Sequence, residues 1–550
     1  MPSLALLVPV VLPLVAGGVT AALGLAGFKP GRALVGAGAW GAVLVLFALW
    51  LPVRSTQELN LGPLGFGAGF DLRLDGVSFA FGLVILVPAA ILLTLQPRSW
   101  QEGTVAALGV GAAMLGVEAG AVLLTALAGG TAATLAVIQL DIEDIRAPRP
   151  PGGVMVAAWL ALSWAGAILQ VVGGTAVYAA VPVSALTVPV FLLLAAAALL
   201  ASGLFPWRGW AAQLWSRPSL RAAGMAVATL YPLGFYLLVR AYEMGDGRYP
   251  QPLLGVALAW LGALVALGVA VRAQSATTRR EYLGEVIPGM GGFALMVIAL
   301  GTPVGLVAGL VMLATIAVMA ACLPLLPDRA GPASLLTIAA AVGLPPGVAF
   351  GARVVGLGAT FEAGDFLGLI GIAGAAAWVV MMVAAARAIG LPAGRGHAVA
   401  ETFPGVAMAL AGLTLVAGPA LPLVVSAFAI PAQSVVMPAA VGSLGGGLSS
   451  VVTLQSELPA LSLFTSLLLI GVLAYGVSGI FGAHLQARPP LFSMPGTTAM
   501  RRVLEQVRAA AVPEQYRSIV NPRALEAAAA GGRPLFWLAA VVALAFAVNR

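Results

Sequence analysis

Cysteine, histidine and charged residues are all scarce in this sequence. Charged side chains make up 9% of the 550 residues, whereas soluble domains carry roughly a quarter, and the mean hydropathy is +1.04. A chain of this length with so few charges cannot cover its surface in water. The composition therefore excludes a soluble globular protein and predicts that most of the surface faces lipid.

The sequence also lacks the ligands that metals and cofactors need. Cys322 is the only cysteine, which excludes an intramolecular disulfide and a cysteine-rich metal site. The two histidines, His397 and His484, lie far apart beside predicted loops, so we expect no metal. There is no ligand set for haem, flavin or an iron–sulfur cluster, and the glycine-rich run at 109–116 follows no strand, so we expect no cofactor. No Ser/His/Asp or paired-carboxylate pattern predicts a catalytic residue.

Long apolar segments, in contrast, recur along the whole chain. Those that are long enough, or nearly so, to cross a bilayer lie at 4–26, 33–52, 75–96, 104–117, 119–139, 153–175, 186–204, 222–241, 252–271, 287–303, 305–326, 332–350, 366–389, 403–429, 462–484 and 534–549. The fourth and fifth are separated only by Glu118. The predicted fold is therefore an all-α polytopic membrane protein with about 14–16 transmembrane helices.

Basic residues test this order of segments, because cytoplasmic loops are enriched in Lys and Arg. All but six of the 27 basic residues follow odd-numbered segments. The six exceptions are Arg54, Arg73, Arg240, Arg248, Arg353 and Arg550. This asymmetry predicts a plasma-membrane protein with the odd-numbered loops in the cytoplasm and both termini outside. It also explains the pI of about 10.1 by topology and attraction to anionic lipid, so we expect no nucleic-acid partner.

The C-terminal part differs in composition from the rest. Residues 485–533 mix Arg, Glu and Ala with apolar residues, and Leu504, Val507 and Arg508 recur at helical spacing. This pattern predicts an amphipathic cytoplasmic segment along the membrane or a neighbouring subunit, with a solvated linker as the alternative. The predicted organisation is a membrane core at 1–430, an extracytoplasmic loop and further helix at 431–484, this lateral segment at 485–533 and a final helix at 534–550.

Four segments, in order, resemble one family of membrane proteins. The run at 70–85, FDLRLDGVSFAFGLVI, carries Asp75 and Ser78 in an LDGLS-like motif, and similar likenesses lie at 204–240, 279–313 and 341–389. Together they resemble the antiporter-like subunits of respiratory complex I, Mrp antiporters and membrane-bound hydrogenases. The resemblance implies inverted repeats with two broken helices, which we place around 202–206 and at Pro345-Pro346, where two helix donors are missing.

The sequence departs from that family at the ionisable residues that carry protons. Positions where the family has a glutamate, lysines or histidines are occupied by Ala128, Ala201, Ala226, Met312, Ile316 and Ala320. The lysine or glutamate of the second broken helix falls on Arg353, which stays charged at physiological pH and cannot relay a proton. We expect Arg353 to form a structural ion pair with Glu362 or Asp365, and we keep a role in ion handling as the alternative.

Three acidic residues complete the candidate site. Glu118 matches a family aspartate at a helix junction, where an interfacial cap or a proton site are the alternatives. Glu285 follows Arg279 and Arg280 on one predicted helix, so local ion pairing is expected. Asp75 belongs to the LDGLS-like motif. The candidate ion-path or structural residues are therefore Arg353, Glu118, Glu285 and Asp75.

These observations support three hypotheses. The first is an antiporter-like membrane subunit of a complex I-related or hydrogenase-like respiratory assembly, structural or with altered proton translocation, and at most a non-catalytic subunit of an oxidoreductase. Its partners would be the lipid bilayer and other membrane subunits. The second is a stand-alone or rewired cation or proton transporter that uses Glu118, Arg353 and Glu285. The third is a carrier for an unrelated solute on the same scaffold. A sealed interior would favour the first hypothesis. Acidic residues gathered in one cavity would favour the second, and a large pocket with a polar lining would favour the third.

Overall fold

The computed structural model of the chain is a bundle of membrane-length helices. It describes residues 4–28, 30, 32–65, 68–95, 99–143, 152–204, 209–215, 220–327, 331–363, 365–391 and 402–438. Within these ranges, eleven helices are long and apolar enough to cross a membrane, and three shorter apolar helices accompany them. The segments predicted at 462–484, 485–533 and 534–549 lie outside the described residues.

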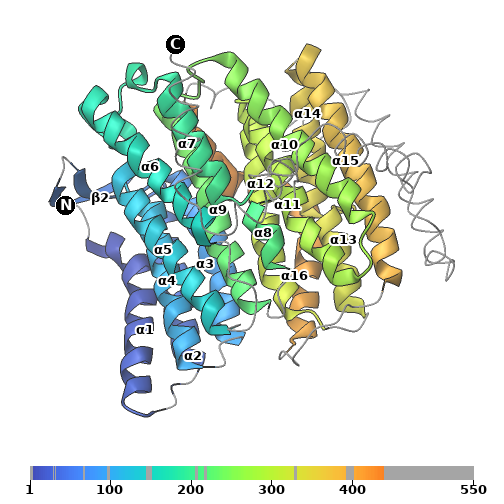
Figure 1. Cartoon of the computed structure of the whole chain (residues 1–550), viewed down its shortest axis with the longest axis horizontal. Coiled ribbons are helices and arrows are strands. Elements are labelled where there is room, and N and C mark those ends of the chain that lie inside the picture. The colour runs from blue at the N-terminus through green and yellow to red at the C-terminus, as the bar shows by residue number, and fades with distance from the viewer. Residues whose placement is uncertain are drawn as a thin grey trace, which may run out of the picture.

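The helices stand side by side, with the N-terminal ones on one flank and α10 to α16 on the other (Figure 1). Their bounds are α1 Val8–Leu25, α2 Arg32–Trp50, α3 Gly76–Leu95, α4 Trp100–Glu118, α5 Val122–Glu143, α6 Gly152–Gly173, α7 Val188–Ala201, α8 Gly209–Leu214, α9 Arg221–Met244, α10 Pro252–Ala273, α11 Arg279–Ile298, α12 Pro303–Cys322, α13 Pro332–Val342, α14 Val348–Glu362, α15 Asp365–Gly390, α16 Pro404–Val416, α17 Leu421–Val424 and α18 Ile430–Val436. Single-turn helices are η1 Leu4–Leu7, η2 Tyr178–Ala180, η3 Val183–Ala185, η4 Leu323–Leu325, η5 Gly418–Ala420 and the π-turn η6 Val425–Ala429.

A short antiparallel hairpin adds β structure to the predicted all-α fold. Strands β1 (Gln57–Gly65) and β2 (Ala68–Leu74) pair with Gln57 opposite Leu74 and Asn60 opposite Asp71. The hairpin connects α2 to α3, and an isolated bridge joins Leu72 to Ala119 after α4. It therefore fixes the chain that leads into α3 against one end of the bundle.

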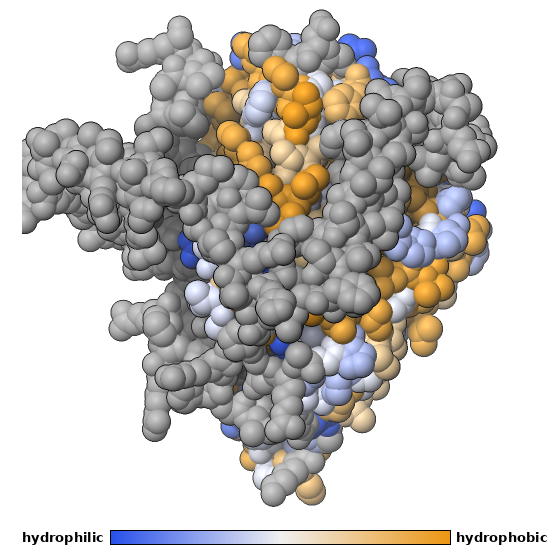
Figure 2. All heavy atoms as spheres, turned by 90° about the vertical axis from the view of Figure 1, so that its right-hand side faces the viewer, coloured by the Kyte–Doolittle hydropathy of each residue, from blue (hydrophilic) through white to orange (hydrophobic). Residues whose placement is uncertain are grey.

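The centre of the bundle is apolar and fully packed. Helix α9 is buried along its whole length and α12 nearly so, whereas α1 and α2 are less than half-buried. The outer helices carry exposed apolar side chains such as Leu369, Ile372 and Val379 on α15. Apolar residues cover much of the described surface on that side of the molecule (Figure 2). Exposed apolar surface of this extent is what a helix facing lipid requires.

Both predicted helix breaks are confirmed. Helix α7 ends at Ala201 and α8 begins at Gly209, with Gly203 in the left-handed region at φ +63°. The segment predicted as one span at 332–350 is two helices, because α13 ends at Val342 and α14 begins only at Val348, after the two prolines. Proline removes the backbone donors that a continuous helix would need here.

Two further limits differ from the prediction. Helix α11 begins at Arg279 and not at 287 as predicted. Thr278 caps its start by accepting a hydrogen bond from the Glu281 amide N–H. The first turns of this helix are polar, so hydropathy alone does not indicate that they belong to it. The segment predicted at 403–429 is interrupted after Val416 and continues through α17, η6 and α18 to Val436. The extracytoplasmic loop expected from 431 therefore does not begin there.

Candidate functional site

Arg240 lies at the centre of a buried polar network at the end of the bundle where α3 begins. Its Nη1 and Nη2 donate to the two carboxylate oxygens of Asp75 at 2.8 and 3.0 Å, and Nη2 also donates to the Ser78 hydroxyl at 2.9 Å. Its Nε donates to the Tyr236 hydroxyl at 3.0 Å. Arg240 and Asp75 are both fully buried. A two-pronged pairing of this kind suits the planar guanidinium group.

Arg73 and Glu243 complete the network. Arg73 Nη1 donates to Glu243 Oε1 at 2.6 Å, and Arg73 Nε lies 3.1 Å from Asp75 Oδ2. Arg240 Nη1 also donates to Glu243. Two cations therefore face two anions, and the group as a whole is neutral. Such compensation is what allows four charges to be buried together.

This network joins three parts of the chain. Arg73 lies on β2, Asp75 begins α3 by accepting from the Ser78 N–H at 2.9 Å, and Arg240 and Glu243 lie on α9. Burial raises the pKa of Asp75, but the guanidinium groups of Arg240 and Arg73 outweigh burial and hold that pKa below its usual value. Asp75 therefore stays ionised and paired. Its carboxylate therefore links β2 and the start of α3 to α9.

Glu118, the last residue of α4, lies next to this network but does not join it. The Val117 carbonyl accepts from the Ser78 hydroxyl at 3.0 Å, and the Ala119 carbonyl accepts from the Tyr236 hydroxyl at 3.4 Å. The Glu118 side chain is 1% exposed, and neither of its oxygens has a hydrogen-bond partner within the described part of the chain. It therefore does not act as the helix cap that was one of the two expectations.

The six positions that lack the family's ionisable residues are all in the closed interior. Ala128 lies on α5, Ala201 ends α7, Ala226 lies on α9, and each is at most 2% exposed. On α12, Met312, Ile316 and Ala320 recur every four residues and are equally buried. At these positions the interior is therefore apolar and offers no group that could bind a proton.

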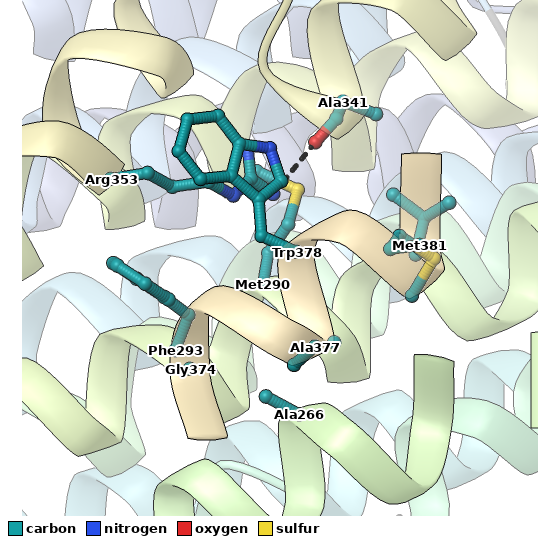
Figure 3. Close-up of a pocket in the computed structure, with 11 residues that line it drawn as sticks. Ala266, Met290, Phe293, Ala341, Arg353, Gly374, Ala377, Trp378 and Met381 are labelled. Atoms are coloured by element: carbon teal, nitrogen blue, oxygen red, sulfur yellow. Dashed lines mark hydrogen bonds between the residues drawn. The ribbon is translucent and has the colours of Figure 1, made fainter. Parts of the chain in front are cut away.

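Arg353 lies on α14 beside the second helix break. Its Nη2 donates to the Ala341 carbonyl at 3.1 Å, and its guanidinium carbon lies 5.5 Å from the centre of the Trp378 ring (Figure 3). The Trp378 indole N–H donates to the Val342 carbonyl at 2.7 Å. Both carbonyls belong to the last turn of α13, where helical partners are missing and the helix dipole favours a cation. Arg353 and Trp378 together therefore cap the broken helix.

The expected ion pair of Arg353 is not formed with Glu362. Arg353 is 4% exposed and no described carboxylate lies in ion-pair range, whereas Glu362 is exposed at the far end of α14, and the side chain of Asp365 lies outside the described residues. The reason is the helix break, which supplies carbonyl oxygens instead of a carboxylate. A cavity of about 20 Å³ adjoins Arg353, and a single water needs roughly 10–15 Å³. The cavity therefore has room for one water.

Gly343 shows how closely the chain folds around Arg353. Its φ of +71° lies in the left-handed region, and a Cβ atom there would lie 2.1 Å from Arg353 Nη1. Glycine is therefore required on both conformational and steric grounds.

The remaining acids take local roles. Glu285 accepts from Arg272 Nε of α10 at 2.8 Å, so it links α11 to α10. Glu281 accepts from the Thr277 N–H and hydroxyl in a capping arrangement at the start of α11, instead of pairing with the arginines before it. Glu285 lies on α11 next to Val286, which lines the Arg353 cavity, whereas Glu118 lies on α4 among α1, α3, α5 and α9. The four candidate residues therefore do not form one site.

Sequence reasoning named Asp75 and Arg240 separately and missed Arg73 and Glu243 as partners. A signal was present, because Arg240 and Glu243 are three residues apart in an otherwise apolar helix. Intramembrane charges at helical spacing predict a buried pair.

The fold matches those of several solved membrane complexes. A chain of the Mrp complex from Dietzia sp. DQ12-45-1b superposes with a TM-score of 0.65 at 17% identity, over 94% of this chain and 61% of that one. A chain of respiratory complex I from Thermus thermophilus superposes with a TM-score of 0.62 at 20% identity, over 81% of this chain and 99% of that one. A chain of the membrane-bound sulfane sulfur reductase, an archaeal respiratory membrane complex, superposes with a TM-score of 0.64 at 14% identity, over 98% of this chain and 99% of that one.

No family model matches this sequence, and no curated protein matches it either. The chain spans 61% of the length of the Mrp chain but nearly the whole length of the other two. Identities of this size establish the fold alone. The chain is a multi-pass membrane protein with the fold of the antiporter-like membrane subunits.

Proposed function

We propose that the protein is an antiporter-like membrane subunit of a complex I-related or hydrogenase-like respiratory assembly, with a structural role in its membrane arm. It would lie in the plasma membrane with both termini on the extracytoplasmic side. The observation that carries the proposal is the set of six buried apolar residues at positions where similar subunits have ionisable groups. Without such groups a proton has no binding site along this line.

Most of the buried charged groups that remain support the same proposal. The Asp75–Arg240 network is neutral and every member is paired, and Arg353 is committed to the end of α13. The two cavities described among the helices have volumes of about 20 and 40 Å³. Binding pockets for small molecules are usually about 300–1,000 Å³, so neither cavity suits a carrier for an unrelated solute.

Purification from the native host tests the assembly. We expect the tagged chain, extracted in a mild detergent, to retain further membrane subunits and redox-active proteins, which mass spectrometry identifies. The control is a tagged unrelated membrane protein of similar abundance, purified in parallel. Recovery of the chain alone, as a monomer or homo-oligomer, would contradict the proposal.

Glu118 favours a second candidate function, proton movement along a rewired path. A carboxyl group buried without a cation or hydrogen-bond donor can hold a proton, which is the property that a proton-carrying site needs. The Ser78 and Tyr236 hydroxyls donate to the carbonyls of the two residues that flank Glu118 in the chain, Val117 and Ala119.

A flux assay separates the two candidates. Proteoliposomes that contain the protein and a pH-sensitive dye are driven by a potassium diffusion potential. A structural subunit gives the proton flux of empty vesicles, and Glu118→Gln leaves that flux unchanged. Flux well above empty vesicles, lost in Glu118→Gln but kept in the control Glu281→Gln, which removes the same group from an exposed position on α11, would favour the rewired path and count against a purely structural role.

A further inference from the structure

A second cavity, of about 40 Å³, lies at the end of the bundle where α11 begins. Its walls come from three stretches of the chain that are distant from one another in sequence. Its lining residues are Trp215, Leu220, Arg279, Arg280, Leu283, Gly284, Leu323, Leu326, Pro327 and Ser334. Trp215 follows α8, and Ser334 lies in the first turn of α13. Leu220 directly precedes α9, Leu283 lies near the start of α11, and Leu323 and Leu326 lie in η4 and just after it. The cavity is therefore a product of the tertiary fold and not of one loop.

Three buried donor groups of this lining lack a partner within the described residues, although Arg279 also donates through Nη2 to the Leu391 carbonyl at 3.0 Å. The Trp215 indole N–H, the Ser334 hydroxyl and Arg279 Nε are buried, and none has a hydrogen-bond partner in the described part of the chain. These three residues are each at most 5% exposed. A buried donor left unpaired costs roughly 1–3 kcal/mol, so three of them around one cavity indicate a missing acceptor.

The charge of the lining defines the acceptor. Among the described lining residues, Arg279 provides a cationic donor and none is acidic. Helices α11 and α13 both begin here, and the N-terminal end of a helix favours an anion because its first amide groups lack helical partners. Space, donors and charge therefore all fit one tetrahedral anion such as a phosphate group.

The surroundings place this cavity at the edge of the membrane. Leu335, next to Ser334, is 45% exposed, as expected of a residue that faces lipid. The basic residues Arg221, Arg279 and Arg280 lie at this end of the bundle, which the distribution of arginine assigns to the cytoplasmic face. Anionic phospholipids are concentrated on that face of a membrane.

We propose that this cavity binds a phosphate-bearing anion, with Arg279, Trp215 and Ser334 as the donors. The phosphate comes either from the headgroup of an anionic phospholipid or from free phosphate in the cytoplasm. The proposal does not depend on the function of the chain as a subunit, because it concerns only the groups that line the cavity.

The test uses the full-length protein, purified and delipidated in mild detergent. Its thermal unfolding midpoint is measured while phosphatidylglycerol, phosphatidylcholine or inorganic phosphate is added. We expect a saturable rise with a phosphate-bearing anion, because a ligand that binds only the folded state stabilises it. Arg279→Gln should weaken the apparent affinity about tenfold, and Trp215→Phe and Ser334→Ala about fivefold each.

The control is Arg248→Gln, which removes the same charge from an exposed position at the opposite end of α9. Protection by phosphatidylglycerol alone identifies a lipid headgroup, and equal protection by inorganic phosphate identifies free phosphate. If Arg279→Gln fails to fold, the two uncharged variants carry the test. Absence of saturable protection by either ligand, or equal protection of wild type and of the Trp215→Phe and Ser334→Ala variants, overturns the proposal.

Discussion

Replacing Arg240 with methionine is expected to destabilise the folded chain by about 3–5 kcal/mol. The guanidinium group donates to Asp75, Ser78 and Tyr236 and faces Glu243, all within the buried network. Its removal leaves the two carboxylates with Arg73 alone, so one negative charge stays buried without compensation. Methionine fills a volume similar to that of arginine, so no large cavity forms. The expected loss of stability is therefore electrostatic in origin. Unfolding of both proteins by SDS in mixed micelles measures this change in the free energy of unfolding.

Two companion variants make this prediction specific. Arg248→Met, at an exposed position close to the end of the same helix, should change stability by no more than about 0.5 kcal/mol. The double variant Asp75→Asn with Arg240→Met should be less destabilised than the sum of the single changes, because each single variant leaves a charge that the other removes. Equal losses for Arg240→Met and Arg248→Met would show that the network contributes nothing.

The helices were largely predictable from the sequence because a bilayer imposes a simple rule. An apolar run of sufficient length must satisfy its own backbone groups, and a helix does so. The limits of α2, α3 and α10 accordingly lie close to the predicted ones. The prediction erred where polar residues are helical, as in the first turns of α11, and where proline interrupts an apolar run, as between α13 and α14.

The candidate site was less predictable, because its bonds join residues that are distant in sequence. Asp75 and Arg240 are 165 positions apart, and no local pattern gives their distance. Arg353 illustrates a different limit. The sequence predicts a carboxylate partner for a buried arginine, but the helix break provides the carbonyl oxygens of Ala341 and the ring of Trp378 instead. Only the path of the backbone reveals such partners.

Two of the buried arginines, Arg240 and Arg353, lie where elements of the fold begin or end. Arg240 joins the β-hairpin and the start of α3 to α9, and Arg353 holds the end of α13 where the chain turns into α14. Arg353 donates to a carbonyl that a continuous helix would satisfy by itself, whereas Arg240 pairs with side chains at the start of α3 and on α9. The side chains of Arg240 and Arg353 are thus paired at the ends of helices, whereas the six buried positions on α5, α7, α9 and α12 carry apolar side chains. This distribution supports the structural role proposed above.

Replacing Gly262 of α10 with alanine is expected to destabilise the chain by about 1–3 kcal/mol. A Cβ atom at Gly262 would lie 2.4 Å from the Met296 nitrogen and 2.7 Å from the Gly292 carbonyl oxygen of α11. Conversely, a Cβ atom at Gly292 of α11 would lie 2.6 Å from the Ala266 nitrogen of α10. The two backbones thus touch through small residues four positions apart, a known mode of helix packing in membranes. Backbone atoms cannot rotate away, so the helices must separate.

Gly412→Ala on α16 is the matched control, because nothing lies within 4 Å of a Cβ atom there. Alanine favours a helix over glycine by about 1 kcal/mol, so the same substitution should stabilise at Gly412 and destabilise at Gly262. Thermal unfolding of both variants in one detergent gives the two signs directly. Stabilisation of the Gly262 variant would mean that α10 and α11 are not in backbone contact. Gly262→Leu should lower the stability more than Gly262→Ala does, because a longer side chain must force the two helices further apart.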